Sequence, residues 1–163
     1  MTKYEILQHK IVSLDEAVKV VNRWKLNSYK TVFTNGCFDI LHKGHIKVLI
    51  SAAQTGNKLI VGLNSDNSVK RLKGSERPLN EAADRALLLA ALQYVDAVVI
   101  FDEDTPLQLI EALQPDVLVK GGDYTIDTIV GASETLQRGG EVVVVPTEEG
   151  YATTQIINKI KNN

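Results

Sequence analysis

The sequence contains a single cysteine, Cys37, among its 163 residues, which excludes an internal disulfide and agrees with a reducing compartment. It also lacks a long apolar run, because runs such as 86–92 and 142–145 fall far short of the ~20 residues that a membrane-spanning helix needs. The first ten residues hold no apolar segment of signal-peptide length. We therefore expect a cytoplasmic protein that is not inserted in a membrane.

The sequence also has no excess of positive charge. The 18 Lys and Arg residues are outnumbered by 20 Asp and Glu residues, which gives a net charge of -2 and argues against a nucleic-acid-binding surface. Any anion site must therefore be local, built from a few side chains and backbone amides. The length and the 44% of hydrophobic residues predict one domain over 1–163, with 1–28 as an N-terminal helical extension.

Short apolar runs alternate with helical patterns along the chain. Strands are predicted over 31–34, 59–63, 97–101, 117–119 and 141–145. Helices are predicted over 14–25, 45–55, 105–115 and 153–161, and a further helix is predicted to begin at residue 80. Ser13 and Glu16 match a capping box, and Asn80 is expected to cap the helix that follows it. Gly36 is expected to turn the backbone sharply after the first strand, and Gly56 to take a left-handed conformation at a helix end.

The predicted strands are continuously apolar instead of alternating with polar residues. This pattern favours an α/β fold: a Rossmann-like, open, parallel five-stranded sheet with helices on both faces. Ligands of such folds bind beyond the carboxyl ends of the strands, so we expect the chemistry to lie there.

The most informative segment, 34–45, follows the first strand directly. His42 and His45 lie three residues apart at a helix entrance, so both imidazoles can face one spot. The free amides and positive dipole end of a helix meet there, and Gly44 allows a ligand to approach closely. This combination suits a phosphate group. A metal site that includes Asp39, or two solvent-facing histidines, are the alternatives.

The segment 42–45 resembles the HxGH signature of the nucleotidyltransferase superfamily, which is related to the class I aminoacyl-tRNA synthetases. Further blocks at 62–66, 71–74, 77–78, 101–106, 120–124 and 149–154 resemble the adenylyltransferases of ADP-heptose synthesis, over about 12–160 in all. The resemblance implies transfer of AMP from ATP to D-glycero-β-D-manno-heptose 1-phosphate, with release of pyrophosphate. It implies Mg²⁺ held mainly by the nucleotide and a product used in lipopolysaccharide synthesis. The sugar-kinase domain that some members carry does not fit in this length, so a separate heptose kinase is expected.

The resemblance and the positions of the blocks give a set of site residues. The expected catalytic residues are His42, His45, Lys73 and Thr154. The expected nucleotide contacts are Asn35, Gly36, Cys37, Phe38, Gly44, Gly121, Asp123, Tyr124 and Thr153. The expected acceptor contacts are Asp66 and Arg85, and no residue is expected to bind metal directly.

Plainer interpretations of some of these residues stay open. Lys70, Arg71 and Lys73 could form a solvated basic turn, and Arg85 could be a surface residue. Thr153 and Thr154 could simply cap the last helix. Ala152 also departs from the family pattern, which has a serine at this position.

Two other functions remain in view. A cytidylyltransferase that acts on glycerol 3-phosphate or a similar acceptor fits the same motifs, and a non-catalytic nucleotide-binding module is an alternative of another class. The sequence leaves a homodimer open, since apolar residues of the first helix could form its contact.

Overall fold

The computed structural model describes residues 1–146 and 151–162. Its core is a five-stranded sheet with the order β3-β2-β1-β4-β5, in which all neighbouring strands are parallel. The strands are β1 (Thr31–Gly36), β2 (Lys58–Asn64), β3 (Ala97–Phe101), β4 (Val117–Gly121) and β5 (Glu141–Val145). This confirms the α/β fold class and the parallel sheet.

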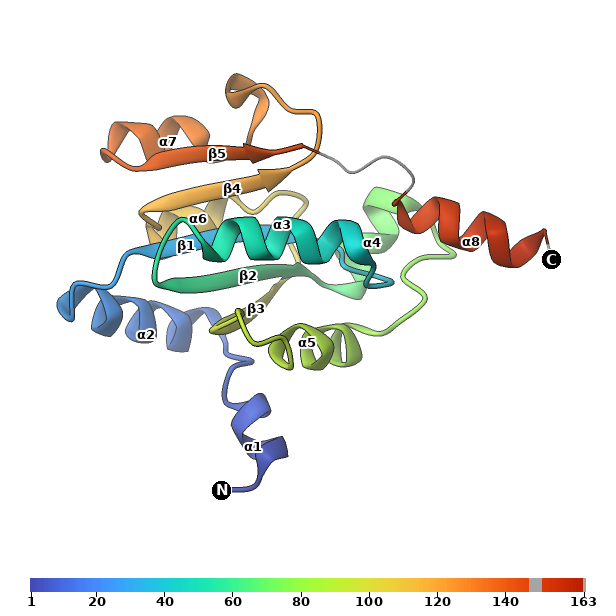
Figure 1. Cartoon of the computed structure of the whole chain (residues 1–163), viewed down its shortest axis with the longest axis horizontal. Helices are drawn as coiled ribbons and strands as arrows, with labels where there is room; N and C mark the ends of the chain where they lie inside the picture. Colours follow the sequence, from blue (N-terminus) through green and yellow to red (C-terminus); the bar gives the residue numbers. More distant parts are fainter. Residues whose placement is uncertain (147–150, 163) are drawn as a thin grey trace.

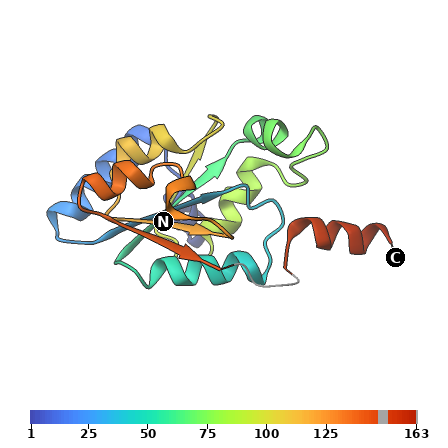
Figure 2. The same ribbon diagram turned by 90° about the horizontal axis from the view of Figure 1, so that it is seen from above.

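Helices cover both faces of the sheet, as Figures 1 and 2 show. One face carries α3 and α5, and the other carries α2, α6 and α7. Their bounds are α2 (Leu14–Leu26), α3 (Lys43–Ala53), α5 (Ala82–Ala90), α6 (Leu107–Leu113) and α7 (Ala132–Gln137). The remaining elements are α1 (Lys3–Gln8), α4 (Asp66–Lys73), the 3-10 turn η1 (Ile126–Thr128) and α8 (Thr153–Lys161).

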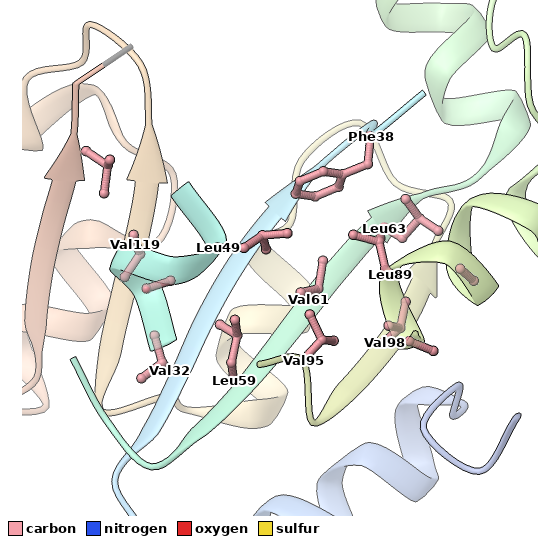
Figure 3. Close-up of a cluster of buried hydrophobic side chains, with 14 of the residues drawn as sticks. Val32, Phe38, Leu49, Leu59, Val61, Leu63, Leu89, Val95, Val98 and Val119 are labelled. Carbon is pink, nitrogen blue, oxygen red and sulfur yellow. The ribbon is translucent and has the colours of Figure 1, made fainter. Parts of the chain in front are cut away.

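Each face of the sheet has its own apolar core. On the α3 and α5 side, Leu49 and Leu89 pack with Val61 of β2 and Phe38 (Figure 3). On the other side, the helices α2, α6 and α7 bury residues such as Ile110 against the sheet. Both cores take residues from the same strands, which explains why these strands are apolar at consecutive positions.

Several element boundaries agree with the sequence prediction. The capping box of α2 is present, since the Ser13 hydroxyl accepts from the Glu16 amide at 3.3 Å and the Glu16 carboxylate accepts from the Ser13 amide at 2.9 Å. The strands β3 and β5 and the helix α8 have the predicted bounds. Residue 11 forms a parallel bridge with Val98, so the N-terminal segment covers the β3 edge of the sheet.

Two of the predicted helix-end assignments are wrong. Helix α3 ends at Ala53, and Gly56 is not in the left-handed region. It is needed for space instead, because a Cβ there would lie 2.7 Å from the Lys30 carbonyl oxygen. Asn80 does not cap α5, which starts after Glu81 without a side-chain cap. The side-chain amide of Asn80 instead donates to the Asp39 carbonyl oxygen at 2.9 Å.

The turn after β1 also differs from the prediction. Gly36 is the last residue of β1, and the left-handed residue is Phe38, with φ 44. A Cβ on Gly36 would approach the Phe38 ring to 3.0 Å, so this glycine provides room for the ring. The basic residues Lys70, Arg71 and Lys73 form part of helix α4, which the sequence did not reveal, and the same is true of α7. Helix α1 lies within the predicted N-terminal helical extension.

The order of the strands fixes where a ligand can bind. The chain proceeds from β1 outward to β2 and β3, and then returns to the other side of β1 for β4 and β5. The loops after β1 and β4 therefore diverge at the carboxyl ends of these strands and leave room for a ligand. Among the helices of residues 1–146 and 151–162, none combines the length and the apolar character of a transmembrane segment.

Candidate active site

A cavity of about 630 Å³ opens at the carboxyl ends of β1 and β4. It brings together most of the residues that the sequence predicted. Those that line it are Asn35, Gly36, Cys37, Phe38, His42, Gly44, His45, Lys73, Gly121, Tyr124, Thr153 and Thr154. Segments from β1, α3, α4, β4 and α8 thus converge on one space.

His42 is held by the start of α3. It is the residue that caps this helix, and its Nδ1 accepts a hydrogen bond from the Gly44 amide at 3.1 Å. A neutral ring that accepts at Nδ1 carries its proton on Nε2, which leaves Nε2 as a donor. Gly44 makes this possible, because a Cβ there would lie 2.9 Å from Cε1 of His42.

The two histidines form a stacked pair. Their ring centroids are 3.8 Å apart with an angle of 26° between the planes, and Phe38 packs against His45 at 5.1 Å. Burial, and then the neighbouring His42, lower the pKa of His45 to about 4, and burial lowers the pKa of His42. Both rings are therefore neutral at neutral pH, and the buried Nδ1 of His45 has no hydrogen-bond partner among the described residues.

The amino end of α8 forms another part of the wall. Its N-cap residue is Ala152, and no side chain caps the helix. The capping role considered for Thr153 and Thr154 is therefore absent, and both residues line the cavity. Free amides and hydroxyls at a helix start are suited to hold phosphate oxygens.

Asp39 has a structural role under this cavity. Its side chain is fully buried and accepts from Arg77 Nε at 2.6 Å and from the amides of Leu79 and Asn80 at 2.8 and 3.0 Å. Burial alone would raise the pKa of Asp39, but the amides of Asn80 and Leu79 and the Arg77 guanidinium outweigh it and hold the pKa below its usual range. The carboxylate thereby fixes the 77–80 loop against the end of β1.

The two predicted acceptor contacts do not line the cavity. Arg85 is 0% exposed, and its guanidinium donates to the carbonyl oxygens of Cys37, Asn64 and Asn80 at 2.6, 2.9 and 2.9 Å. It also donates to Asp66 at 2.8 Å. In this arrangement Arg85 is neither a surface residue nor an acceptor contact, because its donors are used to join the ends of β1 and β2. It is a positioning residue.

Asp123 also lies outside the cavity wall and is exposed, so the hydrogen bond to a nucleotide expected of it has no support in this arrangement. Conversely, Arg77 and Lys120 line the cavity and were not predicted as site residues. Both stand in the blocks that carried the family resemblance, which was the available signal. Arg71, from the predicted basic cluster, is engaged by Asp104 at 2.7 Å.

A second cavity, of about 660 Å³, lies at the amino ends of the strands. Its lysines are already engaged: Lys25 donates to the Leu113 carbonyl at 3.2 Å, and Lys30 pairs with Glu141 at 2.9 Å. Because ligands of open parallel sheets bind at the carboxyl ends, the cavity with the histidines is the candidate active site.

Within residues 1–146 and 151–162, no cluster of histidine, cysteine, aspartate and glutamate is arranged to hold a metal ion. Two carboxylates among the described residues of the cavity wall, Asp39 and Asp104, are already bound by Arg77 and Arg71.

Comparisons with known proteins place the chain in a family. A sequence profile described as cytidylyltransferase-like matches residues 33–161. Among curated proteins, the chain is 57% identical over 152 residues to the "Bifunctional protein HldE" of Geotalea uraniireducens (strain Rf4), covering 93% of this chain and 31% of that protein. It is 53% identical over 154 residues to the protein of the same name from Koribacter versatilis (strain Ellin345), covering 94% and 32%. The chain spans about a third of the length of these relatives.

Solved structures share the fold. A lipopolysaccharide core biosynthesis protein from Thermoplasma volcanium GSS1 aligns with a TM-score of 0.59 and 28% identity, over 76% of this chain and 99% of that one. A pantoate-beta-alanine ligase from Francisella tularensis aligns with a TM-score of 0.60 over 94% of this chain and 78% of that one, but with 15% identity it bears on the fold alone.

Proposed function

The chain belongs to the cytidylyltransferase-like family, and on this basis we propose that it is an adenylyltransferase that transfers AMP from ATP to D-glycero-β-D-manno-heptose 1-phosphate. The products are ADP-heptose and pyrophosphate. The observation that carries the proposal is the stacked pair of neutral imidazoles, which shares one cavity with the uncapped start of α8. Such a site offers several hydrogen-bond donors to a triphosphate.

The choice of acceptor rests on two further observations. The blocks at 62–66, 101–106 and 120–124 resemble the heptose-phosphate adenylyltransferases. The solved structure with 28% identity is described as a lipopolysaccharide core biosynthesis protein, which is consistent with a heptose product.

The proposed reaction needs no general base, because the phosphate oxygen of the acceptor is already ionised at neutral pH. This oxygen attacks the α-phosphorus of ATP, a new P–O bond forms, and the bond to the β-phosphate oxygen breaks as pyrophosphate leaves with the electron pair. His42 and His45 donate hydrogen bonds to the phosphates as negative charge moves toward the leaving group. Lys73 and the hydroxyl of Thr154 hold phosphate oxygens in place.

Mg²⁺ is the proposed cofactor, and it shields the negative charge of the triphosphate. In the described part of the wall, Asp39 and Asp104 are occupied by arginines, which supports an ion that would be held mainly by the nucleotide. A sugar kinase must act before this step to supply the 1-phosphate, and we place both reactions in the cytoplasm.

The test is an assay of the purified protein with ATP, Mg²⁺ and a panel of sugar 1-phosphates, with pyrophosphate measured and the product identified by mass. We expect ADP-heptose from the heptose 1-phosphate. Parallel reactions with CTP and glycerol 3-phosphate test the cytidylyltransferase alternative. ATP binding without pyrophosphate release from any acceptor would instead indicate a non-catalytic module.

A variant ties this activity to the cavity. His45→Ala should lower turnover by about 10²-fold, because it removes a donor that acts on the developing charge. Its melting temperature should stay within a few degrees of wild type. Near-normal turnover would remove His45 from the mechanism.

A further inference from the structure

Lys120, the fourth residue of β4, has no counter-ion among the described residues. Its side chain is half-buried in the cavity wall, and in the described part of the chain no hydrogen bond or ion pair reaches its Nζ. Burial lowers the pKa of Lys120; ionised Cys37 would oppose this effect, and Lys73 adds to it. A buried ammonium in such a position gains free energy when an anion binds beside it.

The position of Lys120 is fixed by an aromatic ring. Its Nζ lies 5.5 Å from the ring centroid of Tyr124. The ring can take this place only because Gly122 has no side chain: its φ is 131, and a Cβ would lie 2.6 Å from Cε2 of Tyr124. The Gly-Gly sequence after β4 thus lets Tyr124 cover one side of the ammonium group, while the cavity stays open on another.

The charges around the cavity do not balance. Asp39 accepts from Arg77, and Asp104 accepts from Arg71. Neither carboxylate pairs with Lys73 or Lys120 among the described residues. Within the described residues, two lysine charges therefore remain uncompensated at one site, which matches the charge of a phosphate monoester dianion.

Both lysines and Cys37, at the turn after β1, line the same cavity. Burial raises the pKa of Cys37, while the positive charges of Lys73, Arg85, Arg77 and Lys120 lower it. Of these four cations, Arg77 and Arg85 are engaged by the carboxylates of Asp39 and Asp66, which leaves the two lysines available to an anion near Cys37.

We propose that Lys120 and Lys73 form the subsite for the phosphate group of the acceptor, and that the histidine pair and the start of α8 are left for the triphosphate of the nucleotide. This rests on the proposed function, since it requires a phosphorylated acceptor. The subsite holds the attacking oxygen on the opposite side of the α-phosphorus from the departing pyrophosphate. It selects a dianionic monoester and excludes the unphosphorylated sugar, whose binding would leave both ammonium groups without an anion.

Substitution of Lys120 tests the subsite by kinetics. Lys120→Met keeps the apolar stem and should raise the KM for the sugar 1-phosphate by about 10- to 100-fold, the worth of one charge-assisted hydrogen bond. The KM for ATP should change by less than about twofold, and Lys120→Arg should recover part of the loss. Lys70→Met, an exposed lysine of the same helix as Lys73, is the matched control and should change neither value. A higher KM for ATP with an unchanged acceptor KM would overturn the proposal.

Cys37, the only cysteine of the chain, gives a readout that does not depend on catalysis. Its alkylation by iodoacetamide is followed against pH, with and without inorganic phosphate. In the wild type, phosphate should raise the thiol pKa and slow alkylation at neutral pH. In Lys120→Met the thiol pKa should already be higher, and phosphate should have little further effect. Circular dichroism and a melting curve check that each variant is folded, and Lys120→Arg serves if the methionine variant is not.

The two experiments separate the subsite from the proposed reaction. If phosphate leaves the thiol unchanged in the wild type, the subsite is wrong even when ADP-heptose is formed. If the phosphate effect depends on Lys120 but no acceptor yields pyrophosphate, the subsite stands and the proposed reaction falls.

Discussion

Replacement of Arg85 by methionine should destabilise the protein severely, although Arg85 lies outside the cavity wall. The guanidinium is 0% exposed and donates to three carbonyl oxygens and one carboxylate. Methionine has a similar apolar stem, so the substitution removes the donors and leaves most of the packing. The carbonyls of Cys37, Asn64 and Asn80 then lose the partner that joins three loops.

The magnitude follows from these bonds. A buried carbonyl that loses its partner costs about 1–3 kcal/mol. Asp66 is 37% exposed and can be rehydrated, so its loss adds little. Two or three orphaned carbonyls therefore give a loss of about 3–6 kcal/mol, near the value expected when a buried charge pair is broken.

The assay is thermal and urea unfolding, followed by circular dichroism. At about 2–4 °C per kcal/mol for a chain of this length, Arg85→Met should melt ~10 °C or more below wild type. Arg23→Met, at an exposed arginine of α2, is the matched control and should cost less than about 0.5 kcal/mol. A loss below about 1 kcal/mol for Arg85→Met would refute the positioning role. Normal stability with a raised acceptor KM would instead support the direct acceptor contact that the sequence suggested.

The stability of the protein should also depend on pH through His45. The pKa of about 4 in the folded state lies below the 6.5 of the free side chain, so the unfolded state binds more protons and stability falls as the pH drops from 6.5 toward 4. At about pH 5 this amounts to ~2 kcal/mol, and melting curves of His45→Asn should show a correspondingly smaller drop between pH 7 and pH 5 than wild type. Gly44→Ala should displace the His42 ring, whose Cε1 would lie 2.9 Å from the new Cβ, and lower turnover by about 10-fold or more in steady-state kinetics while the protein remains folded. Thr154→Val should lower turnover with ATP by about 10-fold without loss of stability, because no side chain caps α8; unchanged turnover would leave its hydroxyl without a function in the reaction.

The sheet could be predicted from the sequence because its signal is local. Continuous apolar runs mark the strands: β2 is buried at every position after its first residue, and the observed bounds of β3 and β5 agree with the prediction. Helix starts were less certain. Ser13 caps α2 as predicted. The side-chain amide of Asn80, in contrast, donates a hydrogen bond to the carbonyl oxygen of Asp39 instead of capping α5. A sequence pattern shows that a polar side chain is able to cap but not which partner it meets.

The cavity residues near the first strand were expected from one local motif, and distant ones such as Tyr124 and Thr154 were expected from the blocks that carried the family resemblance. His42, Gly44 and His45 form one turn of chain, and the structure stacks the two rings. Lys120 lies far along the chain from Lys73, and only the parallel placement of the strands brings both to one cavity. Arg85 shows the opposite error, because its position in a helix gave no sign that the guanidinium would be fully buried.

The division of charge within the cavity suggests how a protein with a net charge of -2 can bring two anions together. Lysines carry full charge and attract the phosphate of the acceptor before reaction, so they contribute mainly to ground-state binding of that substrate. Neutral imidazoles attract a resting triphosphate less, and their hydrogen bonds strengthen as negative charge builds on the leaving group. The burial that keeps His45 uncharged therefore favours turnover over tight substrate binding. A variant that raised the pKa of His45 above neutrality should bind ATP and pyrophosphate more tightly and release pyrophosphate more slowly.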